Sequence, residues 1–160
     1  MFMNPRIAVF SFVSLCLPLA TLAQSALYGP PIALEVAKKV AAGAAAEAKK
    51  NNFTMAIAIV DNGGTLTYFE KIDGTQLGSV DVAIGKARSA NAYKRPTKVF
   101  EDAVVGGRNA LLAVPGVLPV EGGVPLIADG KVIGAIGVSG GSAPQDGQVA
   151  AAGAGALTAK

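Results

Sequence analysis

Residues 53–69 form the stretch FTMAIAIVDNGGTLTYF, which decides the fold. Bulky apolar residues occupy every second position from Phe53 to Ile59, with smaller residues between them. The run stops at Asp61-Asn62-Gly63-Gly64, whose residue types suit a tight turn, and a second extended run continues from Leu66 to Phe69. Alternation on both sides of such a turn predicts a β-hairpin.

A second hairpin is predicted at residues 124–138, VPLIADGKVIGAIGV, where two extended runs flank Asp129-Gly130. The stretch Leu126–Gly130 resembles Ile59–Gly63 in the first hairpin. This echo fits a duplicated half of the domain. It fits equally the general preference of hairpin turns for Asn-Gly and Asp-Gly, so both interpretations stay open.

Four predicted helices surround the hairpins, with proline, asparagine or small polar residues at their expected ends. The resulting element order is α-β-β-α-α-β-β-α, which predicts an α+β domain with one mostly antiparallel sheet flanked by helices. The helices are expected from Pro30 to Asn51, from about Ser79 to Arg95, from Thr97 to about Leu112, and from Pro144 to about Leu157.

The N-terminal segment has the order of a secretory signal: Arg6, an uncharged apolar run from Ile7 to Leu19, and the small-residue stretch Ala20–Ala23. We therefore predict a cleaved signal peptide at residues 1–23, a single domain at residues 24–160, and a periplasmic or secreted location. The apolar run is shorter than the roughly 20 residues that a helix needs to cross a membrane, so no membrane anchor is expected. Cys16 follows Leu15, where lipidation requires a small residue, and is expected to leave with the signal.

The composition of the mature chain excludes several functions. Removing Arg6 leaves 13 basic residues (14 minus 1) against 11 acidic ones, a net charge of +2 that calls for no nucleic-acid partner. The chain has no histidine, and its single cysteine lies in the signal, so thiolate and imidazole metal sites and disulfides are excluded. Gly137-Val138-Ser139-Gly140-Gly141 matches a nucleophile elbow but lacks the histidine base that this chemistry needs. We predict no catalytic residue and no metal ligand.

A cluster of cations is the remaining candidate for chemistry: Lys86, Arg88, Lys94, Arg95 and Lys98 lie within 13 positions. Such a cluster can bind carboxylates. Neighbouring positions on one helical face are three or four residues apart, so Lys86 and Arg88 cannot share a face. A solvated face with a favourable helix end explains the cluster as well.

Five motifs occur in the order seen in the GlcG/HbpS family, which the chain resembles over about residues 31–158. They are Val60–Gly64, Ile72–Ser79, Lys86–Ala90, Gly122–Leu126 and Val132–Gly141. The resemblance implies a profilin/roadblock-like fold and a homo-oligomer. Some exported members bind haem and report on redox or iron state, which implies a possible sensor partner, and others accompany catabolic pathways.

The resemblance implies a small-molecule ligand, and haem is the sharpest hypothesis. Without histidine or cysteine, iron would rely on weak ligands such as the oxygens of Tyr28, Tyr68, Tyr93, Ser89 and Thr97, or on Met55. Two other hypotheses stay open: an enzyme or accessory binder for a small organic acid, and an oligomeric scaffold with a vestigial pocket. The predicted ligand-binding residues are Lys86, Arg88, Ser89, Tyr93, Glu121, Gly122, Gly123, Ser139 and Asp146.

Overall fold

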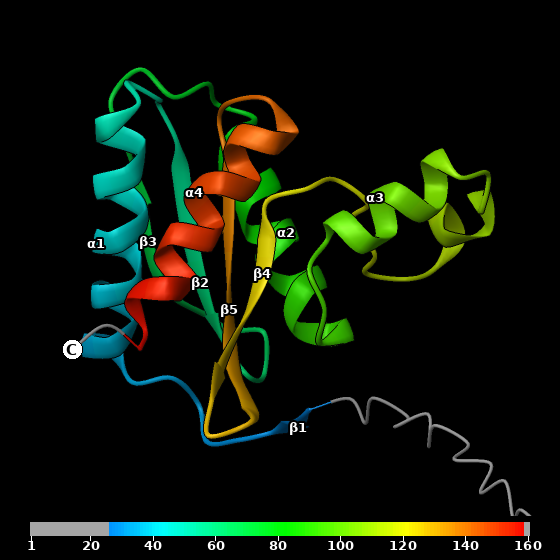
Figure 1. Cartoon of the computed structure of the whole chain (residues 1–160), viewed down its shortest axis with the longest axis horizontal. Helices are drawn as coiled ribbons and strands as arrows, with labels where there is room; N and C mark the ends of the chain where they lie inside the picture. The colour runs from blue at the N-terminus through cyan, green and yellow to red at the C-terminus, as the bar shows by residue number, and fades with distance from the viewer. Residues whose placement is uncertain (1–25, 159–160) are drawn as a thin grey trace, which may run out of the picture.

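The computed structural model of the protein describes residues 26–158 (Figure 1). The predicted signal peptide and Cys16 lie outside these residues. In chain order the elements are β1 (Leu27–Tyr28), α1 (Leu34–Lys50), β2 (Ala56–Asp61), β3 (Leu66–Lys71), α2 (Ser79–Tyr93), α3 (Lys98–Val105), the 3-10 helix η1 (Asn109–Ala113), β4 (Gly123–Ala128), β5 (Lys131–Ser139) and α4 (Ala143–Ala156).

The strands form one five-stranded sheet. The hairpins β2–β3 and β4–β5 are both present, and they join through antiparallel pairing of β2 with β5, in which Ile57 lies opposite Val138. β5 therefore lies in the middle, with β4 along one edge and β2 along the other. β1 pairs in parallel with the start of β5, at Lys131 and Val132.

Both faces of the sheet are covered, and the alternation in β2 explains how. Ile57 and Ile59 belong to a core that α1 and α4 share with the sheet. Ala58 and Val60 point to the opposite face, where they pack against alanines of α2. Figure 1 shows α1 and α4 together on one side of the sheet and α2 behind it. A core built from alanine brings α2 very close to the strands: a Cβ at Gly137 of β5 would overlap the backbone of Ala83 and Ala87.

The predicted class, element order and mostly antiparallel sheet are confirmed. The prediction for the third helix was wrong, because α3 ends at Val105 and not near Leu112. Gly106 and Gly107 follow, and Gly107 adopts a left-handed φ of 95° that ends the helix. The first helix also starts later than predicted, at Leu34, and β1 was not predicted.

Residues 98–121 form an arm that extends away from the sheet, on the side opposite α1 (Figure 1). Phe100 is the one buried residue in this arm. Its apolar side chains Val99, Val105, Leu112 and Val120 are exposed, at 47%, 83%, 63% and 37% respectively.

Candidate functional site

Lys86 and Asp146 meet in the interior of the protein. The Lys86 ammonium lies 2.6 Å from Asp146 Oδ2 and donates a second hydrogen bond to the Val138 carbonyl, at 3.1 Å. Their side chains are 0% and 4% exposed. Lys86 comes from α2 and Asp146 from the first turn of α4, so the ion pair links the helices on opposite faces of the sheet. It lies at the end of the sheet where β4 begins and β5 ends.

Glycine is required beside this ion pair. Gly122 has a φ of 126°, and a Cβ there would lie 2.6 Å from the Val138 carbonyl oxygen and 2.9 Å from Lys86 Nζ. A Cβ at Gly123 would overlap the Lys86 carbonyl. These glycines permit a close approach of the backbone, and the atoms that approach it belong to the protein itself.

The surroundings of Asp146 hold its carboxyl in place. Gly141 N–H donates to Oδ1 at 2.9 Å. Burial raises the pKa of Asp146, and the Lys86 ammonium and the Gly141 amide oppose this shift without cancelling it. In this conformation the Asp146 carboxyl and the Lys86 ammonium are each other's charged partner.

Glu121 and Ser139 are the sequence neighbours of Gly122 and Val138, which lie beside the ion pair. The Glu121 amide donates to the Glu101 carboxylate at 2.5 Å, and its own carboxylate lies 4.0 Å from Lys98. Ser139 is buried at the end of β5, opposite Ala56.

Ser89 and Tyr93 of α2 hold the loop that follows η1. Ser89 Oγ accepts a hydrogen bond from the Leu118 amide at 3.0 Å, and the Tyr93 hydroxyl donates to the Pro115 carbonyl at 2.5 Å. The Tyr93 ring also packs edge-on against Phe100. The loop is thereby fixed over the helix.

A cavity, here called the α2 hollow, lies between this loop and α2. Its volume is about 410 Å³, within the range of small-molecule sites. A Cβ at Gly85 would come within 3.2 Å of Leu118, so the missing side chain keeps the cavity open. Arg88 is its single cation and also donates to the Gly64 carbonyl at 3.2 Å. The lining residues are Asp81, Val82, Gly85, Arg88, Gly116, Val117 and Leu118.

Apart from Glu121 and Ser139, the predicted site residues divide into two groups. Lys86, Gly122, Gly123 and Asp146 surround the buried ion pair, whereas Arg88, Ser89 and Tyr93 lie toward the α2 hollow or its loop. The sequence prediction missed Val82 and Gly85, and it treated residues 115–116 only as a loop. A signal existed, because Val82, Gly85, Ser89 and Tyr93 follow one helical face at spacings of three and four. Whether any of these residues binds a ligand stays a prediction.

The other candidate iron ligands lie elsewhere. Met55 is fully buried, and Tyr68 packs against the core on the α1 side of the sheet. Thr97 is buried and accepts a hydrogen bond from the Gly123 amide. Tyr28 is 43% exposed, and its hydroxyl donates to the carbonyl of Asn91. None of these four residues lines the α2 hollow.

Residues 26–158 contain no group of three or more histidine, cysteine, aspartate or glutamate side chains able to hold a metal ion. Within that same range, no helix is sufficiently long and apolar to cross a membrane.

The fold defines a small α+β domain with one mostly antiparallel sheet. The chain belongs to the family described as haem degrading protein HbpS-like, whose match covers residues 32–155. It is 39% identical over 105 residues to protein GlcG of Escherichia coli strain K12, covering 66% of this chain and 78% of that protein.

Solved structures of HbpS and PduOC are similar to this chain in fold. A double mutant of HbpS from Streptomyces reticuli matches with a TM-score of 0.75 and 30% identity, over 97% of this chain and all (100%) of that one. A complex of PduOC with haem matches with a TM-score of 0.72 and 28% identity, over 80% of this chain and 96% of that one.

Proposed function

We propose that this chain is an exported haem-binding protein with a redox-sensing or iron-sensing role, which holds the porphyrin in the α2 hollow and ligates its iron weakly. Family membership and the likeness to a haem complex of PduOC support haem as the ligand. The observation that carries the proposal is the α2 hollow itself: a largely apolar cavity whose charged lining residues are Arg88 and Asp81.

The residues that line the α2 hollow suit the porphyrin ring of haem. Val82, Val117 and Leu118 offer apolar contact for a porphyrin face, and Gly85 leaves the helix backbone uncovered between them. Arg88 can pair with a propionate carboxylate. Bound haem would supply an iron centre for redox or oxygen chemistry.

The side chains near this cavity that could ligate iron carry hydroxyl groups, which we expect to bind iron weakly. Ser89 contacts its wall through the Leu118 amide, and Tyr93 holds the same loop at Pro115. Either hydroxyl would have to leave its present hydrogen bond to reach iron. We therefore expect haem to be held mainly by apolar contact and by Arg88, and to exchange readily.

Haem titration followed by the Soret absorbance tests the site. Gly85→Leu should fill the cavity and weaken haem binding at least about tenfold, since it removes the contact surface of one porphyrin face. Gly155→Leu is the matched control: it places the same side chain within α4, where a Cβ would meet no atom within 4 Å. Equal haem affinity in the wild type and both variants, with the fold intact by circular dichroism, would contradict the assigned site.

Three further variants separate iron ligation from propionate binding. Ser89→Ala or Tyr93→Phe should alter the Soret band if that hydroxyl ligates iron. Arg88→Ala should weaken haem affinity about tenfold and leave the band unchanged, because it loses a charge-assisted hydrogen bond away from the iron. If the Soret band and the haem affinity stay the same in all three variants, Arg88 and the hydroxyls of Ser89 and Tyr93 have no role in haem binding.

Export is tested by the mass of the mature protein. The proposal expects an N-terminus at or near Gln24 after secretion. Recovery of exported protein with residue 1 intact, or with an acylated Cys16, would refute the cleaved signal.

A further inference from the structure

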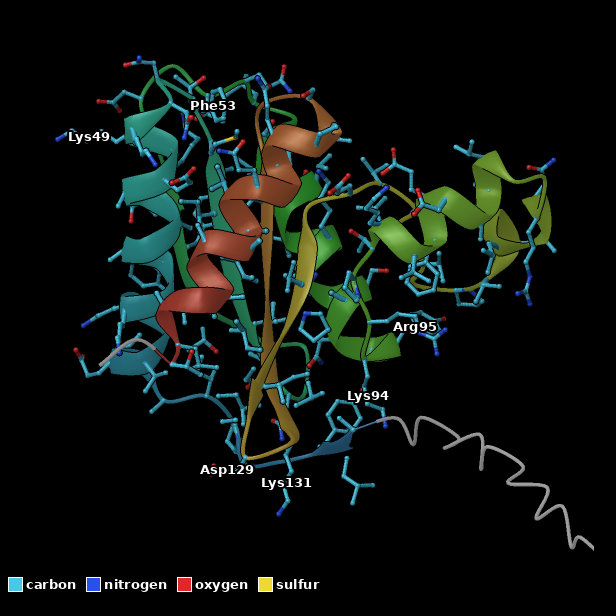
Figure 2. All side chains as sticks on the ribbon, in the orientation of Figure 1. Lys49, Phe53, Lys94, Arg95, Asp129 and Lys131 are labelled. Carbon is cyan, nitrogen blue, oxygen red and sulfur yellow. The ribbon has the colours of Figure 1, made fainter. Side chains whose placement is uncertain are left out.

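A second cavity lies on the other side of the sheet, between the C-terminal end of α1 and strand β3. Its volume is about 440 Å³, and it is formed by Ala45, Lys49, Asn52, Phe53, Glu70 and Ile72, among others. We call it the α1–β3 hollow. Lys49 and Phe53 mark its position at the top of Figure 2.

Ordered backbone builds the floor of this cavity. Asn52 takes a left-handed φ of 56° just after α1, and the Phe53 amide then donates to the Ala48 carbonyl at 2.9 Å. The Ile72 amide donates to the Met55 carbonyl, also at 2.9 Å. Phe53 and Ile72 each pack against the main core, so the apolar floor is preformed.

Two opposite charges come from opposite walls. Lys49 belongs to α1 and Glu70 to β3, and within residues 26–158 neither forms a salt bridge, with 4.0 Å as the limit. The neighbouring Lys50, by contrast, lies 3.9 Å from Glu47 on its own helix. The Tyr68 hydroxyl contacts Glu70 Oε2 at 3.4 Å, which leaves the other carboxylate oxygen able to accept from a ligand.

We propose that the α1–β3 hollow binds a free α-amino acid with an apolar side chain. Lys49 would hold the carboxylate and Glu70 the ammonium group, while Phe53, Ile72 and Ala45 would contact the side chain. A zwitterion matches two separated charges of opposite sign over an apolar floor, whereas a ligand of single charge would leave one wall unpaired. This site is independent of the α2 hollow and of haem.

The assignment is tested by combining three ligands with two variants of the mature protein. Each ligand is titrated into the protein, and binding is monitored by the shifts of NMR signals. Leucine should bind, whereas leucinamide, which lacks the carboxylate, and N-acetylleucine, which lacks the ammonium, should each bind about tenfold more weakly. Lys49→Gln should weaken leucine and N-acetylleucine but leave leucinamide unchanged. Glu70→Gln should weaken leucine and leucinamide but leave N-acetylleucine unchanged.

Lys50→Gln is the control for charge, since it removes the adjacent lysine and keeps both walls. Gly85→Leu is the control for the other cavity, and should reduce haem binding without affecting leucine. The proposal is overturned if leucine shows no saturable shifts at millimolar concentration, or if Lys50→Gln weakens leucine as much as Lys49→Gln does.

Discussion

Among residues 26–158, Lys86 is the largest side chain that is completely buried, and Asp146 is the one charged group that pairs with its ammonium. We predict that Asp146→Ala lowers the free energy of unfolding by about 3–5 kcal/mol, because it leaves a buried ammonium unpaired. The double variant Lys86→Met and Asp146→Leu should lose less stability than the summed losses of Lys86→Met alone and Asp146→Leu alone, since apolar groups can replace a buried pair. Urea unfolding measures all of these changes. A loss below about 1 kcal/mol for Asp146→Ala would indicate that the pair behaves like an exposed one.

Lys86 and its neighbours also show which contacts can be predicted from one sequence and which cannot. Arg88 was expected to face away from Lys86, and helical spacing was enough to predict that. The pairing of Lys86 with Asp146 joins positions sixty residues apart, and no local pattern encodes such a contact. Lys86 was predicted to bind a ligand because it belongs to the cation cluster, and in the structure its ammonium contacts the Asp146 carboxylate.

Among the elements, α1 and α4 approach each other closely through small residues. A Cβ at Gly153 would lie 2.6 Å from Ile136 Cδ1 and 3.0 Å from Ala44 Cβ. Gly153→Ala should therefore cost about 1–3 kcal/mol of stability through overpacking. Gly155→Ala, in the same helix with no atom within 4 Å, should instead gain up to about 1 kcal/mol from helix propensity. Thermal unfolding of the two variants compares them directly, and a shift of the same sign in both would disprove the packing argument.

Element prediction succeeded where periodicity was strong and failed where it was weak. The alternation from Phe53 to Ile59 predicted the first strand of a hairpin, which the structure places at Ala56–Asp61. Residues 97–112 have apolar residues that suit a single helix, but the Gly106-Gly107 pair divides them and α3 ends at Val105. β1 has two residues and exists only through its pairing with β5, so its own sequence could not predict it.

At the scale of the whole molecule, the arm of residues 98–121 supports the predicted homo-oligomer. Its apolar side chains have few partners within the chain, and burying them in an interface would be favourable. Small residues of α1 and α4, by contrast, pack against each other within one chain. We expect light scattering at micromolar concentration to give a multiple of the monomer mass. Val105→Asp with Leu112→Asp should shift this mass toward the monomer, and a monomeric wild type would refute the prediction.

The central position of β5 also determines how fast its amide hydrogens can be replaced by deuterium. β4 pairs along one of its edges, and β2 and β1 pair along the other. Its interior amides can therefore become accessible only when the sheet as a whole comes apart, so their exchange rates measure the stability of the entire domain. The arm lacks such protection, and its amides should report only local opening.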